Sequence, residues 1–383
     1  MSTDKTIAGR DPVTGGGIAI TMRDGRIAAI AETVSQDEAY LTPGLVDLQV
    51  NGYAGLDLND GALTPKRVSE LTRIMAGLGV TTYLPTLVTG SRERLLDGLD
   101  AIATARREDV LCARMIPGVH MEGPSIAPED GPRGAHPAEH VRPPSLEEFD
   151  AWQKASGGLV RLVTLAPEYE EAPAYIRAIT AQGVHVAIGH SSATPEQVHA
   201  AAEAGARLST HLGNGAAALM PRHPNLIWAQ LADDRLTATL IADGHHLPDD
   251  TFKTMLRAKG LERALLVSDS VALAGMEPGI YRQPIGGDVE VCADGRVGIA
   301  GTPYLAGAGL PLIENVPVAM RMTGLSLAQA LRLATANPGA FVDGRGVMKL
   351  NASADLIRFS IDGKTGSFEL KNTLVHGEEV FPA

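Results

Sequence analysis

Cysteine, aromatic residues and long apolar runs are all scarce in this 383-residue chain. Its two cysteines, Cys112 and Cys292, are far apart and lack CxxC spacing, which argues against a thiolate metal site and predicts a reducing, cytoplasmic location. No apolar run reaches the roughly 18 residues of a membrane span, and the first ten residues lack the apolar segment of a secretion signal. Aromatic residues make up 4% of the chain, so the core must rest on Ala, Val, Leu and Ile.

Positive charge is also in deficit, and the formal net charge is −12. This balance argues against nucleic acid or an anionic membrane as a partner, although a local basic pocket for an anionic substrate remains compatible with it. The hydrophobic fraction of 44% and the charged fraction of 20% are typical of a soluble globular enzyme. The loop after the first predicted strand has no GxGxxG motif, which weakens a dinucleotide-binding fold.

Apolar segments of strand length alternate with helical patterns through the middle of the chain. Helix starts are marked by proline after Thr64 and Thr194, and by capping-box spacings such as Ser145 with Glu148 and Ser326 with Gln329. Eight β units joined by helices favour a (β/α)₈ TIM barrel over an open doubly wound sheet. The predicted strands are Val46–Val50, Thr81–Leu87, Met115–Met121, Val160–Leu165, His185–His190, Ala206–His211, Thr237–Ala242 and Ala264–Asp269.

Both ends of the chain are rich in short strands. The segments Gly17–Met22 and Arg26–Ala31 flank Asp24-Gly25, a strong hairpin signal. The C-terminal end repeats this style, with predicted strands Ala354–Ile361, Ser367–Leu370 and Thr373–His376. We therefore expect residues 1–43 and 349–383 to form one small β-sandwich module, with the barrel at residues 44–348.

Polar residues recur at the carboxyl ends of the predicted barrel strands. Because these ends converge on the mouth where barrel enzymes do their chemistry, the side chains should meet there. The residues are Gln49 and Asn51 after the first strand, Glu122 after the third, His190 and His211 at the fifth and sixth, Asp243, His245 and His246 after the seventh, and Asp269 at the eighth.

Two imidazoles and one carboxylate are a common ligand set for a catalytic zinc ion, so Glu122, His190 and His211 are the candidate ligands of one divalent ion, with Zn²⁺ as the expected metal. Such an ion acidifies a bound water and polarises a carbonyl group. Asp269, outside this set, is the candidate general base and acid. The sequence therefore predicts metal-assisted hydrolysis.

Each of these residues also has a plainer interpretation. His190 or His211 alone could be a hydrogen-bonded histidine at a strand end, and Asp269 alone could cap the next segment. His120 shares a strand face with Glu122 and could contact it or simply pack, so we do not count it as a ligand. His245 and His246 are adjacent, and the sequence does not decide which one faces the site.

At these positions the chain resembles the N-acetylglucosamine-6-phosphate deacetylase family of the amidohydrolase superfamily. The resemblance rests on PGLVDLQVNG at 43–52, HMEGP at 120–124, GHS at 189–191 and HL at 211–212. Many amidohydrolases have a His-x-His pair where this chain has Gln49 and Asn51, as single-metal members of the deacetylase family do. The resemblance thus implies one ion, with these two amides shaping the pocket beside it.

The resemblance also implies substrate contacts and a homodimer. His136 matches a family histidine that touches the sugar hydroxyls, and His246 matches one beside the substrate. Asn214 and Gly215 fall where the family holds the sugar phosphate, and Arg222 aligns with an arginine that binds this phosphate, often across a dimer interface. An arginine fork suits a phosphate dianion.

The implied reaction is hydrolysis of the N-acetyl amide of an amino-sugar phosphate, N-acetylglucosamine 6-phosphate in the first place. Loops after the sixth and eighth strands depart from the family pattern, for example at His211–Ala216 and Ser268–Ala272. They keep open an amidohydrolase that acts by the same mechanism on another N-acyl compound or on a cyclic amide or lactone. A third hypothesis is a catalytically silent sugar-phosphate binder. The predicted base beside the metal argues against it, because a binder has no need of a base.

Overall fold

A parallel eight-stranded barrel forms the centre of the computed structural model, which describes residues 4–34, 38–283 and 287–382. The strand order β14-β13-β12-β11-β10-β9-β8-β5 makes every neighbour parallel. The ends of the sheet meet where Val50 bridges Ser270 and where the Asp269 amide donates to the Gln49 carbonyl. The strands are β5 (Leu45–Val50), β8 (Val80–Val88), β9 (Val119–Glu122), β10 (Val160–Leu165), β11 (His185–Ile188), β12 (Leu208–Ser209), β13 (Thr237–Leu240) and β14 (Ala264–Leu266).

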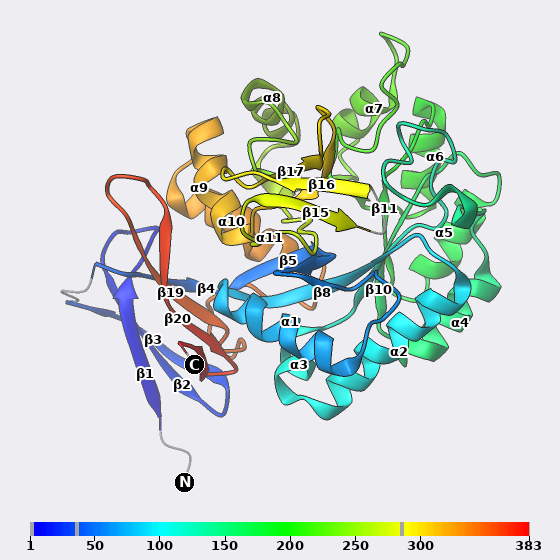
Figure 1. Ribbon diagram of the computed structural model, residues 1–383. Helices are drawn as coiled ribbons and strands as arrows, with labels where there is room; N and C mark the ends of the chain where they lie inside the picture. Colours follow the sequence, from blue (N-terminus) through cyan, green and yellow to red (C-terminus); the bar gives the residue numbers. More distant parts are fainter. Residues whose placement is uncertain (1–3, 35–37, 284–286, 383) are drawn as a thin grey trace.

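Helices surround this barrel, as the predicted alternation requires (Figure 1). Thr194 with Gln197 and Ser326 with Gln329 form complete capping boxes. Ser145 also caps its helix, but the Glu148 carboxylate accepts from Arg142 instead of closing the box. The α-helices are α1 (Pro65–Gly77), α2 (Arg92–Glu108), α3 (Val110–Met115), α4 (Leu146–Ser156), α5 (Ala172–Thr180), α6 (Pro195–Ala204), α7 (Leu226–Ala232), α8 (Asp249–Lys259), α9 (Leu312–Thr323), α10 (Leu327–Ala334) and α11 (Ala336–Gly339).

The predicted third strand was wrong at its start. Its first residue, Met115, is the last residue of helix α3, and β9 begins only at Val119. The Asp109 side chain accepts a hydrogen bond from the Leu111 amide and so begins a helix in a segment whose apolar residues fit either structure.

Two layers of apolar side chains fill the barrel region. The larger cluster lies between the strands and the surrounding helices, with buried members such as Leu71 on α1 and Phe149 on α4. A smaller cluster gathers Val46, Leu48 and residues from other barrel strands. Because successive strand residues face opposite ways, strands covered on both sides are almost wholly apolar, and β5 is buried along its whole length.

A seven-stranded sheet from both ends of the chain lies beside the barrel, at the lower left of Figure 1. Strand β4 joins the two ends, because it pairs with β1 on one side and β19 on the other. The predicted hairpin at Asp24-Gly25 is confirmed, with φ of 50° and 76° at these two residues. The sheet comprises β1 (Lys5–Arg10), β2 (Gly17–Arg23), β3 (Arg26–Thr33), β4 (Tyr40–Pro43), β19 (Leu356–Ile361), β20 (Phe368–Val375) and β21 (Glu378–Phe381).

The C-terminal strands differ in detail from the sequence prediction. The segments Ser367–Leu370 and Thr373–His376 are one strand, β20, with a register shift opposite β19. Strand β21, which pairs with β20, was not predicted. The division of the chain at residues 43 and 349 stays a prediction.

A third, antiparallel sheet, which we call the covering sheet, was missed by the sequence analysis. It lies over the barrel mouth in Figure 1, drawn in yellow. Its strands are β15 (Gly279–Gln283), β16 (Gly287–Val291), β17 (Arg296–Ile299) and β18 (Leu305–Ala308). Its inner face buries Val289, Val291 and Val297 against Leu273. A short hairpin, β6 (Gly52–Tyr53) with β7 (Leu56–Asp57), follows β5 in the chain.

Within the described residues, no helix is both long and apolar enough to span a membrane.

Candidate active site

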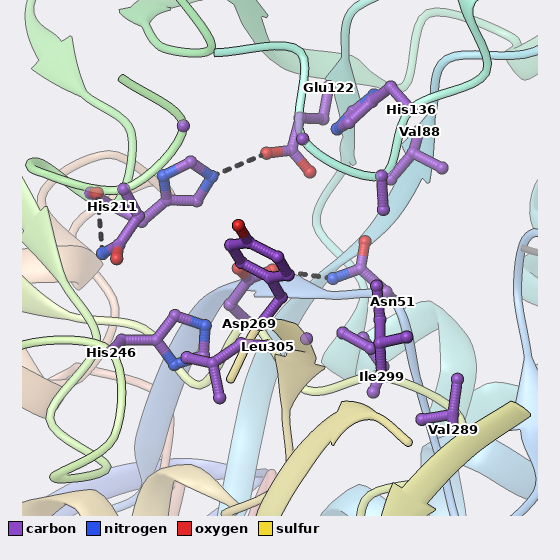
Figure 2. A pocket seen from close by; sticks show the side chains of 18 of the residues that line it. Asn51, Val88, Glu122, His136, His211, His246, Asp269, Val289, Ile299 and Leu305 are labelled. Atoms are coloured by element: carbon purple, nitrogen blue, oxygen red, sulfur yellow. Dashed lines mark hydrogen bonds and ion pairs between the residues drawn. The ribbon is translucent and has the colours of Figure 1, made fainter. Parts of the chain in front are cut away.

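Three predicted metal ligands converge at the barrel mouth. Glu122 ends β9, and its Oε1 lies 3.1 Å from His190 Nε2 and 3.0 Å from His211 Nε2. The two Nε2 atoms are 3.2 Å apart. All three side chains are buried, and Figure 2 shows the contact between His211 and Glu122.

This cluster has the donor chemistry of a cation site. His190 Nδ1 lies 2.8 Å from the Pro132 carbonyl, an acceptor, so Nδ1 carries the hydrogen and Nε2 presents a lone pair. That lone pair faces the Glu122 carboxylate, another acceptor. Two acceptors 3.1 Å apart repel each other unless a proton or a cation lies beside both, so the residues fit a divalent ion.

The pKa values of the cluster reflect the same proximity. Burial opposes charge on both groups, but the hydrogen bond and charge of Glu122 raise the pKa of His211 to about 9. Despite the same burial penalty, His190 and His211 hold the pKa of Glu122 well below its ordinary value. The protein thus balances one negative group with positive charge at this point.

His136 approaches the same place from the loop after β9. One ligand atom from each of Glu122, His136 and His190 lies within 4.8 Å of the others. His136 Nδ1 is 2.8 Å from Thr89 Oγ1, and burial lowers the pKa of this ring to about 3, so it is neutral. His136 can therefore serve as a further ligand or as a hydrogen-bonding group beside the metal.

The backbone at these residues is unusual. Strands β11, β12 and β14 end before His190, His211 and Asp269, although the sequence analysis extended each strand to these residues. The three residues have positive φ values of 50°, 27° and 51°, in the left-handed region that side chains disfavour. Such strain in non-glycine residues is concentrated at functional sites, which supports a role for all three.

Asp269 lies in the wall of the same cavity. Desolvation and the charge of Glu122 raise its pKa to about 6, while His211, His246 and a hydrogen bond from Asn51 oppose the rise. The Asn51 Nδ2 atom donates to Asp269 Oδ1 over 2.8 Å (Figure 2). A carboxyl group with this pKa is ionised at neutral pH and still basic enough to take a proton.

Gln49 and Asn51 each serve one carboxylate. Gln49 Nε2 donates to Glu122 Oε1 over 3.0 Å, as Asn51 does to Asp269. Both amides are buried at the end of β5. They hold two negative side chains in place without adding negative charge of their own.

A cavity of about 480 Å³ opens over this cluster. Of the predicted substrate contacts, His136, Asn214, Gly215 and His246 line it, together with Asn51. Gly215 has φ of 58°, and a Cβ atom there would be 2.8 Å from His190 Nδ1, so only glycine lets this loop pack against His190.

Arg222 does not line the cavity. It is exposed in the loop between β12 and α7, and no ion pair or side-chain hydrogen bond engages it among the residues that the structure describes. In Figure 1 this loop projects from the top of the molecule near α7. Within a single chain Arg222 is therefore not part of the cavity wall.

The two adjacent histidines have different surroundings. His246 lines the cavity, and its Nδ1 lies 2.6 Å from Asp243 Oδ2. His245 instead lies 3.1 Å, through Nε2, from the carbonyl of Asp294 in the turn between β16 and β17. His246 is thus the histidine that faces the cavity.

His120 lies deeper than the cluster. Its Nδ1 is 3.1 Å from the Leu48 carbonyl and its Nε2 is 2.8 Å from Thr164 Oγ1. Thr164 Oγ1 is in turn 2.6 Å from Thr210 Oγ1. These contacts join β5, β9 and β10 to the end of β12, directly beneath the candidate ligands.

The sequence analysis missed the apolar part of the cavity wall. Val271, Val289, Ile299 and Leu305 line it, and the last three belong to the covering sheet. The alternation of polar and apolar residues from 287 to 291 and the Asp294-Gly295 pair were available signals for a hairpin.

Comparison with known proteins agrees with this architecture. The amidohydrolase family model matches residues 40–380. An N-acetylgalactosamine-6-phosphate deacetylase of Escherichia coli O157:H7 is 34% identical over 333 residues, covering 86% of each chain. An N-acetylglucosamine-6-phosphate deacetylase of Bacillus subtilis is 29% identical over 90% of this chain and 89% of its own length.

Solved structures give the same result. A variant N-acetyl-D-glucosamine-6-phosphate deacetylase of Mycobacterium smegmatis, in complex with N-acetyl-D-glucosamine 6-phosphate, has a TM-score of 0.87 and 28% identity, with 99% of each chain covered. The corresponding enzyme of Pasteurella multocida has a TM-score of 0.85 and 25% identity, covering 98% of this chain and 99% of its own. The chain belongs to the amidohydrolase family and, within it, to the N-acetylglucosamine-6-phosphate deacetylase family.

Proposed function

We propose that this protein is a metal-dependent deacetylase that hydrolyses N-acetylglucosamine 6-phosphate to glucosamine 6-phosphate and acetate. The observation that carries the proposal is the convergence of Glu122, His190 and His211 in one cavity with Asp269. The names of the relatives support the substrate class. One divalent ion, Zn²⁺ in our proposal, would be held by Glu122, His190 and His211.

The ion, when bound, supplies Lewis acidity for a water molecule and for the acetyl carbonyl. Asp269 takes the proton of the attacking water and delivers it to the amine nitrogen as the carbon–nitrogen bond breaks. Asn51 keeps the Asp269 carboxylate oriented, and Gln49 does the same for Glu122. His136, Asn214, the backbone at Gly215 and His246 bind the sugar in the cavity.

The phosphate requires a cation that the single chain does not place in the cavity. No Lys or Arg is among the described residues that line it. We therefore propose a homodimer of cytoplasmic location in which Arg222 of one subunit reaches the phosphate bound by the other. The exposed position of Arg222 and of Leu219 on the same loop supports this arrangement.

The lack of a Lys or Arg among the described residues of the cavity wall also favours one alternative: a neutral N-acyl compound or a cyclic amide or lactone, hydrolysed by the same groups. Assays of N-acetylglucosamine with and without the 6-phosphate separate the two. We expect metal-dependent acetate release from the phosphorylated sugar at a much higher kcat/KM. Equal rates with the two sugars would contradict recognition of the phosphate. If no amide or lactone were hydrolysed, the protein would be a catalytically silent binder.

Two substitutions test the assigned roles. Asp269→Asn should abolish turnover while the protein still binds the metal, and retained turnover would contradict its role as base. Arg222→Ala should raise KM only for the phosphorylated sugar. Arg257, exposed on α8, provides the matched control, because Arg257→Ala removes a surface charge from a different element.

A further inference from the structure

The apolar wall of the cavity has no part in the reaction described above. Val271 follows Asp269 by two residues, and Ile299 projects from strand β17 of the covering sheet. Both are partly exposed, whereas Val289 beside them is 2% exposed. The three side chains form what we call the acyl recess.

The recess and two of the proposed sugar-binding residues, Asn214 and His246, lie on different sides of Asp269. Figure 2 shows His211 on one side of Asp269, and Asn51, Ile299 and Val289 on the other. The Asn214–Gly215 loop belongs to the His211 side, because the Asn214 side chain donates to the His211 carbonyl. An amide held between the metal cluster and Asp269 therefore has a polar end and an apolar end available to it.

The charges around the recess restrict what it can accept. Asp57, Glu122 and Asp269 line the cavity, while no Lys or Arg among its described residues does. A negatively charged acyl chain would meet the carboxylates of Asp57 and Asp269 in this wall and would find no Lys or Arg among its described residues to pair with. A neutral apolar group would be removed from water by the recess, which is favourable in proportion to its area.

We propose that the recess binds the acyl group of the substrate and admits straight acyl chains longer than acetyl. This inference rests on the proposed function and names the acyl part of its substrate. The hydroxyl-rich sugar matches the polar side, where Asn214 and His246 lie, so the other end of the amide points toward Val271 and Ile299. The protein is then an N-acyl amino-sugar amidohydrolase with a preference for neutral acyl chains.

A homologous series of N-acetyl, N-propionyl and N-butyryl glucosamine 6-phosphate tests the proposal. We expect kcat/KM to rise with chain length, by up to about fourfold for each methylene group that the recess buries. N-succinyl glucosamine 6-phosphate is the charged counterpart of the butyryl compound and should be a poor substrate. A fall in kcat/KM with each added methylene would overturn the proposal.

Substitution of Ile299 locates the effect. Ile299→Phe should lower the butyryl-to-acetyl ratio of kcat/KM at least tenfold, and Ile299→Ala provides a second, smaller variant should the first fail to fold. Ile280 is 67% exposed on the same covering sheet, so Ile280→Phe is the matched control and should keep the wild-type ratio. An unchanged ratio in both Ile299 variants would refute the assignment.

The same compounds distinguish failure of the recess from failure of the proposed function. Hydrolysis of the acetyl compound alone would refute the binding of longer acyl chains in the recess, while the proposed deacetylase activity would stand. If no compound is hydrolysed, the proposed deacetylase activity is refuted. Kd values of the same compounds, measured by calorimetry, then test whether the recess binds the acyl group. Affinity that increases with chain length supports it, and affinity that stays level or decreases overturns it.

Discussion

Replacing Asn51 with leucine should move the acid limb of the pH–rate profile to higher pH. Asn51 donates to Asp269 Oδ1 over 2.8 Å and is 8% exposed, so leucine fills the space but provides no hydrogen bond. A hydrogen bond to a charged group contributes about 1.5–3 kcal/mol. Its loss disfavours the ionised carboxylate and raises the pKa of Asp269 by about one to two.

The direction of the effect follows from the form of Asp269 that acts. The pKa of this carboxyl is about 6, raised by desolvation and the charge of Glu122, and the base must be ionised. Activity is therefore present above this pKa and lost as the pH falls through it. A pKa near 7.5 in the variant would lower kcat/KM roughly eightfold at pH 6.5 and hardly at all at pH 9.

Stopped-flow or coupled acetate assays from pH 5 to 9.5 on both proteins measure this displacement. A bound cation lowers the pKa of Asp269 in both, so the difference between the two profiles is the quantity to compare. Asn315 is a buried amide that donates to the Val267 carbonyl, and Asn315→Leu should leave the acid limb unmoved. A uniform loss of activity at all pH values in Asn51→Leu would refute the reasoning.

Three further predictions concern the metal cluster and the barrel beneath it. Dialysis against a chelator should abolish turnover and lower Tm, and added Zn²⁺ should restore both; an active, metal-free protein by elemental analysis would contradict the site. Thr164→Val should lower the free energy of unfolding by about 2 kcal/mol in urea titrations, because His120 Nε2 loses its buried partner, and an unchanged value would show that this bond contributes nothing. Gly215→Ala should weaken zinc affinity in competition titrations, because its Cβ would press on His190, and wild-type affinity would exclude this contact.

The convergence of the candidate site was predictable because parallel barrel strands share one direction. Glu122, His190, His211 and Asp269 stand at strand ends in the sequence, and this geometry alone brings them to one mouth. Their fine placement was not predictable. The left-handed conformation of the last three depends on the surrounding loops, and no local pattern in the chain encodes it.

The covering sheet shows a second limit of sequence reasoning. Its strands are short and half polar, and they pair with each other apart from one bridge between Ala308 and Ser270, so they give a weaker signal than the strand-length apolar segments of the barrel. Helix α3 shows a third limit. The six residues after Asp109 mix apolar and polar side chains in an order that fits a strand as well as a helix. Arg222 matched a motif, but a motif says nothing about whether a side chain serves its own chain or a neighbour.

Backbone strain at Asp269 gives a test that is independent of turnover. With φ of 51°, this residue holds a conformation that costs a residue with a Cβ about 1–2 kcal/mol and costs glycine almost nothing. Asp269→Gly and Asp269→Ala both remove the carboxylate and its bond to Asn51, so these losses cancel in a comparison of the two variants. Glycine also increases the entropy of the unfolded chain by about 0.4–1 kcal/mol, which offsets part of the relief. We therefore expect the glycine variant to exceed the alanine variant by about 0.5–1 kcal/mol in free energy of unfolding, measured in metal-free urea titrations. An alanine variant as stable as the glycine variant would mean that the strand end relaxes freely, and that the left-handed turn does not constrain the orientation of the proposed catalytic carboxylate.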